Sequence, residues 1–157
     1  MDQPNYLTDF QVEVARIFFG LKATDGYLVT GGAALLASDL IARPTEDLDL
    51  FASTPTTSVI EAKEAFLRAL ERRGCEVTVL QDSPTFCRMV VGQAGKEVLV
   101  DLAIDSPPNR RPTVTVLGPT LAPLELAGRK LGRLRSTEPD VAVYVGEASA
   151  AEDARRG

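Results

Sequence analysis

The sequence contains no histidine and no tryptophan, and only two of its 157 residues are cysteine. Without histidine, a Ser-His-Asp triad, a Cys-His pair and a histidine-ligated zinc site are all excluded. The two cysteines, Cys75 and Cys87, fit no zinc-site spacing and do not make a disulfide framework, so we expect both thiols to be reduced and buried. Any catalysis must therefore depend on carboxylates, lysine, cysteine or a metal held by oxygen ligands.

A hydrophobic run long enough to cross a membrane is also missing. The most apolar stretch covers residues 27–37, and it is interrupted by Gly31 and Gly32. The N-terminus lacks the positive charges that begin a secretory signal peptide. The net charge of −5 disfavours a surface that coats nucleic acid, although it does not exclude a local basic face. These features predict a cytoplasmic protein with no membrane partner.

The hydrophobic pattern predicts helices and strands that alternate along the chain. Apolar periodicity and capping signals predict helices at residues 8–22, 33–41, 57–73 and 124–134. Short apolar or alternating runs between turn signals predict strands at residues 27–29, 47–51, 76–80, 86–91, 97–104 and 113–117. This order predicts an α+β (α/β-like) fold, a mixed β-sheet with flanking helices mainly on one side. We expect one domain over residues 1–135 and a short, frayed extension over residues 136–157.

Asp47 and Asp49 alternate with leucines in the predicted strand Asp-Leu-Asp-Leu-Phe. Side chains at positions i and i+2 of a strand point to the same face, about 6.6 Å apart, so the two carboxylates would share one patch. Carboxylates this close favour a cation between them, and Mg²⁺ takes one or two protein carboxylates together with phosphate oxygens. A solvated acidic face of an edge strand is the alternative for this motif taken alone.

Gly31 and Gly32 lie between a predicted strand and a predicted helix. Backbone N–H groups and the dipole at a helix N-terminus favour an anion, and glycine lets that backbone approach a phosphate. A tight strand-to-helix turn is the alternative. Asp47 follows Gly31 by sixteen residues with one helix between them, and this combination favours a metal-bound triphosphate.

Asp101 interrupts an apolar strand, where an acid is costly unless a cation accompanies it. Asp105, at the end of the same strand, is the competing candidate, but we expect it to cap the turn into Ser106. A third carboxylate beside Asp47 and Asp49 would complete a metal shell and draw the proton from an attacking hydroxyl, as two-metal chemistry requires.

Together these motifs resemble a known family. The segment GYLVTGGAALLASDLIARPTEDLDLF is similar to the first motif of the DNA polymerase β-type nucleotidyltransferases, and within them most of all to the AbiEii/MenT toxins of bacterial toxin–antitoxin systems. The likeness covers about residues 25–135, and one departure is Ala33, where the family often has serine or threonine. The matching positions are Gly31, Gly32, Arg43, Thr45, Asp47, Asp49 and, in ELAGRKLGRL, Lys130.

The resemblance implies the polymerase β-type nucleotidyltransferase fold and the transfer of NMP from an NTP to an acceptor hydroxyl. By the same resemblance, Gly31 and Gly32 hold the triphosphate, and Arg43 braces the loop or a phosphate. Lys130 would be both catalytic and nucleotide-binding, meeting the phosphates or the base. Basic residues around Lys130 form a helix face that would hold RNA or triphosphate, with a solvated helix end as the alternative.

The resemblance further implies that Asp47, Asp49 and Asp101 are catalytic and hold two Mg²⁺ ions. The implied acceptor is RNA, with a tRNA 3′ end favoured, and the protein would be a toxin with a cognate antitoxin. The first alternative keeps the chemistry but uses a protein or small-molecule acceptor. The second is a catalytically idle module that binds a nucleotide or a partner protein.

Overall fold

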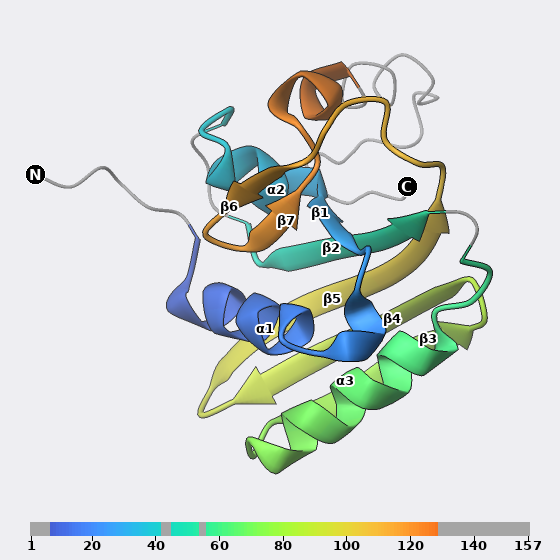
Figure 1. The fold of residues 1–157 in the computed structure, drawn as a ribbon. Coiled ribbons are helices and arrows are strands. Elements are labelled where there is room, and N and C mark those ends of the chain that lie inside the picture. The colour runs from blue at the N-terminus through green and yellow to red at the C-terminus, as the bar shows by residue number, and fades with distance from the viewer. Residues whose placement is uncertain (1–6, 42–44, 54–55, 129–157) are drawn as a thin grey trace, which may run out of the picture.

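The computed structural model describes residues 7–41, 45–53 and 56–128. Within these ranges the strands form one seven-stranded mixed sheet in the order β3-β4-β5-β2-β1-β7-β6 (Figure 1). β2 runs parallel to β5 and β1 parallel to β7, and the other neighbours are antiparallel. The strands are β1 (Leu28–Thr30), β2 (Asp47–Ser53), β3 (Glu76–Ser83), β4 (Phe86–Gln93), β5 (Lys96–Asp105), β6 (Thr113–Thr115) and β7 (Gly118–Thr120).

Helices α1 (Asp9–Phe19) and α3 (Ile60–Arg72) lie side by side on one face of this sheet (Figure 1). Their apolar sides bury against alternate residues of the strands, and the rings of Phe18 and Phe66 meet edge to face with centroids 5.0 Å apart. The core includes Leu48, Leu50, Phe66, Leu70, Met89, Val100 and Leu102, each at most 1% exposed. The predicted mixed sheet with flanking helices is confirmed.

A capping box begins α1 and ties the helix to the start of β2. Thr8 Oγ1 accepts a hydrogen bond from Gln11 N at 3.0 Å, and Thr8 N donates to Gln11 Oε1 at 2.8 Å. The buried Gln11 also donates from Nε2 to the carbonyl of Asp47 at 3.0 Å. This side chain therefore fixes the first residue of β2 relative to α1, because a buried amide without partners would be costly.

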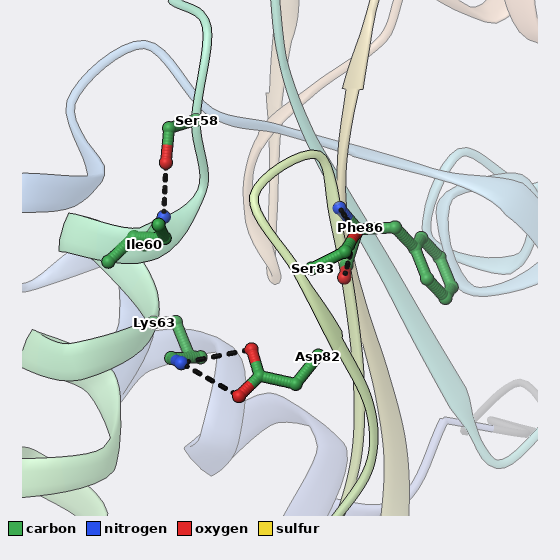
Figure 2. A network of polar contacts seen from close by, with 6 residues as sticks. All are labelled: Ser58, Ile60, Lys63, Asp82, Ser83 and Phe86. Carbon is green, nitrogen blue, oxygen red and sulfur yellow. Dashed lines mark hydrogen bonds and ion pairs between the residues drawn. The ribbon is translucent and has the colours of Figure 1, made fainter.

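Three predicted helices have different bounds in the structure, and the first, predicted to reach residue 22, ends at Phe19. Helix α2 runs over Gly31–Ala37, so it begins earlier and ends earlier than the predicted 33–41. Helix α3 begins at Ile60, and the predicted start at Thr57 is wrong. There, Val59 N donates to the Pro84 carbonyl at 2.7 Å. Ile60 N donates to Ser58 Oγ at 3.0 Å (Figure 2), so the helix starts only after these two bonds.

The three strands predicted between residues 76 and 104 are present and form an antiparallel meander, β3-β4-β5. The single strand predicted at residues 113–117 is instead a hairpin of β6 and β7. Residues 123–128 are helical, and the remainder of the predicted helix 124–134 lies outside the described residues. Among the described helices, none combines the length and the apolar character that a membrane crossing requires.

Both cysteines are buried and unpaired in the core, as predicted. Burial raises the pKa of the Cys75 thiol and also that of the Cys87 thiol, so neither is activated as a nucleophile. The apolar residues at helical spacing in and just before α3, Val59, Ala62, Phe66 and Leu70, are likewise buried.

Candidate active site

A row of polar residues crosses four neighbouring strands on the sheet face away from α1 and α3. The parallel register of β2 and β5 sets Asp49 beside Asp101. The antiparallel register of β4 and β5 sets Arg88 opposite Asp101, and that of β1 and β2 sets Thr30 opposite Asp49. Asp47, two residues before Asp49, shares the same face. Because adjacent strands are about 4.8 Å apart, the three predicted carboxylates belong to one small patch.

Gly31 leaves the space that the Asp49 side chain occupies. Its φ of +75° is a conformation that residues with a Cβ rarely adopt. A Cβ on Gly31 would also collide with the Asp49 carboxylate, lying 2.9 Å from Cγ. A Cβ on Gly32 would come within 3.4 Å of Thr45 Oγ1. The glycine pair thus packs directly against the Asp-x-Asp segment, which joins the two halves of the predicted motif in space.

Arg88 forms a two-pronged ion pair with Asp101. Nε lies 2.8 Å from Oδ1 and Nη2 lies 2.9 Å from Oδ2, with 32% of the arginine side chain and 17% of the aspartate side chain exposed. The hydrogen bond to Asp101 raises the pKa of Arg88; burial opposes the rise, and the charges of Asp101, Asp49 and Asp47 add to it. The guanidinium also lies 5.4 Å from the centre of the Phe86 ring. Sequence analysis missed Arg88.

The donor atoms of this patch suit a hard divalent cation. In the described part of the chain, no group of three or more His, Cys, Asp or Glu side chains is arranged so that it could hold a metal ion by itself. Mg²⁺ does not require such a group, because it usually takes one or two protein carboxylates and fills its shell with phosphate oxygens and water. Each oxygen of Asp101 accepts one bond from Arg88 and keeps further acceptor capacity. The residues present therefore fit Mg²⁺ that arrives with a triphosphate.

The competing acid, Asp105, lies at the end of β5 and pairs with Ser53. Its Oδ1 accepts a hydrogen bond from Ser106 N at 2.7 Å, which confirms the predicted cap of the turn. The structure therefore sets Asp101, and not Asp105, beside Asp49. Two further predicted residues, Arg43 and Lys130, lie outside the described residues.

Glu125, like Arg88, was not predicted from the sequence. Its side chain is almost fully buried, and its two carboxylate oxygens accept hydrogen bonds from Asn109 N at 2.8 Å and Arg110 N at 3.1 Å. It thereby holds the loop after β5 against the helical residues 123–128. A hollow of about 530 Å³ beside it is lined by Asn109, Arg110, Leu124, Glu125 and Gly128. The pairing joins residues fifteen or more positions apart, which no local pattern reveals.

Comparison with known proteins decides the family. The model of the family described as "Nucleotidyl transferase AbiEii toxin, Type IV TA system" matches residues 18–152. The chain belongs to the AbiEii nucleotidyltransferase toxin family. The resemblance noted in the sequence is confirmed, and the match includes all three aspartates, the glycine pair and Lys130.

Solved structures show the same fold as this AbiEii chain. JHP933 from Helicobacter pylori superimposes with a TM-score of 0.56 at 16% identity, over 80% of this chain and 57% of that one. A second H. pylori protein, described as a nucleotidyltransferase, gives 0.54 at 17% identity, over 78% of this chain and 56% of that one. The AbiEii chain thus spans little more than half the length of these relatives. No curated protein sequence matches it significantly.

Proposed function

We propose that this chain is a metal-dependent nucleotidyltransferase that moves NMP from an NTP to an acceptor hydroxyl. The acceptor oxygen attacks the α-phosphorus, and pyrophosphate leaves. The observation that carries the proposal is the placement of Asp49 beside Asp101 on parallel strands, with Asp47 on the same face. Arg88 offsets part of the charge of these three carboxylates, and a bound divalent cation would offset more of it.

In this mechanism, Asp47 and Asp49 offer the oxygen ligands for a divalent cation. Bound Mg²⁺, as one or two ions, supplies the positive charge that offsets the triphosphate. Asp101 is the proposed acceptor of the proton from the attacking hydroxyl. Gly31 keeps Asp49 in place by leaving room for its carboxylate.

Four residues are proposed to hold the triphosphate: Gly31, Gly32, Arg43 and Lys130. The glycines border the carboxylate patch, with the Asp49 carboxylate beside Gly31 and Thr45 beside Gly32, and their backbone N–H groups are the proposed phosphate contacts. Arg43 and Lys130 are proposed to contribute positive charge. The hydrogen bonds that Glu125 accepts from Asn109 N and Arg110 N anchor the loop beside the helical residues 123–128, which precede Lys130 in the sequence.

The proposed acceptor is RNA, in particular a tRNA 3′ end, and the proposed role is that of a cytoplasmic toxin restrained by a cognate antitoxin. The family supports this role, since its description is that of a toxin. The net charge of −5 favours instead an acceptor that is not a polyanion, such as a protein hydroxyl or a small molecule. A catalytically idle module that binds a nucleotide or a partner protein is the remaining candidate.

An acceptor screen separates these candidates. The purified chain is incubated with Mg²⁺, total tRNA and each α-labelled NTP in turn, with and without a protein extract, beside Asp49→Asn. We expect label on tRNA with the wild-type protein and none with the variant. Label on a protein would identify a protein hydroxyl, and not tRNA, as the acceptor. No label on any acceptor, together with metal-dependent binding of NTP, would support the idle module.

A further inference from the structure

The aspartate cluster contains its own positive charge. Arg88 lies on β4, directly opposite Asp101, and its charge also interacts with those of Asp49 and Asp47. The guanidinium does not lose its proton at any physiological pH. Both side chains of the ion pair are mostly withdrawn from solvent, so salt and water screen the attraction less than they would at an open surface.

The geometry of the pair fixes the direction of the Asp101 carboxylate. Two parallel N–H···O bonds, from Nε and Nη2, hold both oxygens of Asp101 in one plane with the guanidinium. Phe86, two residues before Arg88 on the same strand face, lies 5.4 Å below the guanidinium and supports it from a second direction. A lysine at this position would keep the charge but lose the two-pronged hold.

We propose that Arg88 is the resident counterion of the aspartate cluster and the residue that positions Asp101 within it. This rests on the proposed function, because it assigns the cluster to a divalent cation. Arg88 would have two opposed effects on that cation. Its positive charge lowers the attraction of the cluster for a divalent ion. Its two hydrogen bonds hold the Asp101 carboxylate in the orientation that transfer requires.

The opposed effects separate this role from a structural one. Loss of a residue that only maintains the fold would weaken cation binding and turnover together. Loss of Arg88 should instead tighten the binding of a bare divalent cation, because the net charge around the cluster becomes more negative. Turnover should fall at the same time, because Asp101 loses the two bonds that orient it.

The test measures Mn²⁺ binding to the nucleotide-free protein by electron paramagnetic resonance. We expect Arg88→Met to bind Mn²⁺ about tenfold more tightly than wild type. Arg88→Lys, which keeps the charge, should bind as wild type does. Both variants should transfer nucleotide at least about tenfold more slowly, since neither has the two-pronged hold. Arg72→Met, a change of an exposed arginine on α3, is the matched control and should alter neither quantity.

Unchanged or weaker Mn²⁺ binding by Arg88→Met would overturn the inference, as would the absence of Mn²⁺ binding in every protein. If circular dichroism shows that Arg88→Met does not fold, Arg88→Gln replaces it. Equal Mn²⁺ affinities of Arg88→Gln and Arg88→Lys would then overturn the inference. The proposed function fails separately. If the wild-type protein transfers no nucleotide but the Mn²⁺ affinities follow the expected order, the counterion role of Arg88 stands and the nucleotidyltransferase activity is refuted.

Discussion

Arg88 on β4 and Asp101 on β5 lie opposite each other in an antiparallel pair and are joined by hydrogen bonds of 2.8 and 2.9 Å. On its other side, Asp101 has Asp49 of β2 as its neighbour in register. The proposed proton acceptor is therefore held between an arginine and a second acid. All three lie on the sheet face opposite the core, so changes in this row should affect activity and stability separately.

Asp47→Asn and Asp49→Asn should each lower nucleotide transfer by about 100-fold or more, because each removes a charged oxygen ligand. The free energy of unfolding in metal-free buffer should change by less than about 1 kcal/mol, because relief of repulsion among the carboxylates is opposed by loss of attraction to Arg88. Transfer rates and urea denaturation test this. Asp105→Asn is the control, because Asp105 lies at the end of β5, where it caps the turn at Ser106 and is in register with Ser53 rather than Asp49. Comparable activity in all three variants would refute the site.

Gly31→Ala should destabilise the protein and also abolish transfer. The left-handed backbone costs about 1 kcal/mol for a residue with a Cβ, and the added methyl group would displace the Asp49 carboxylate. Gly26→Ala is a matched control, since Gly26 has a φ of +91° but no atom within 4 Å of the added Cβ. It should lose similar backbone stability and retain transfer. Full activity of Gly31→Ala would show that the Asp49 carboxylate does not need the space beside Gly31.

Tyr27 should make the fold sensitive to alkaline pH. Its side chain is buried, and among the described residues its hydroxyl finds no hydrogen-bond partner. Burial raises the pKa of Tyr27 from 10.0 to about 12. Because the folded pKa exceeds the unfolded one, the contribution to stability is complete below the unfolded pKa and is lost as the pH rises through the folded one.

Tyr27→Phe removes that alkaline loss. We expect the free energy of unfolding to change little at neutral pH, or to rise by about 1 kcal/mol as the unpaired buried hydroxyl disappears. Between the unfolded and the folded pKa, the variant should lose less stability than wild type. Urea denaturation of both proteins across that pH interval measures the difference. If the free energies of unfolding of the two proteins fall in parallel with rising pH, Tyr27 does not cause the alkaline sensitivity.

The ion pair between Lys63 of α3 and Asp82 of β3 should contribute little, although its geometry is good (Figure 2). The hydrogen bond to Asp82, at 3.0 Å, raises the pKa of Lys63. Asp82 is half exposed, however, and such pairs contribute about 0–1 kcal/mol. Lys63→Met should therefore cost less than about 1 kcal/mol, whereas Phe66→Ala in the core should cost about 3–5 kcal/mol. Thermal denaturation of both variants compares them.

Features that depend on local patterns could be predicted from the sequence. The alternation of Asp47 and Asp49 with leucines predicted a strand with both acids on one face, and the structure has it. Capping signals predicted a helix from residue 8, and Thr8 forms its cap. The choice of Asp101 over Asp105 also depended on local chemistry, namely an acid within an apolar run.

Features that depend on strand register could not. Arg88 faces the acids only because β4 and β5 pair as they do, and a shift of one residue would turn it to the opposite face. The hairpin of β6 and β7 was also missed. Its second strand begins with Gly118 and Pro119, residues that usually indicate a turn, and Gly118 has a φ of +115° against the ring of Phe19.

The most direct test of the central claim compares α-labelled with γ-labelled NTP in parallel reactions with Mg²⁺, tRNA and the wild-type, Asp49→Asn or Asp105→Asn protein. A nucleotidyltransferase moves the α label to the acceptor and releases the γ label as pyrophosphate. We expect this with the wild-type and Asp105→Asn proteins, and neither event with Asp49→Asn. Transfer of the γ label to the acceptor, or equal α-label transfer by Asp49→Asn, would contradict the account.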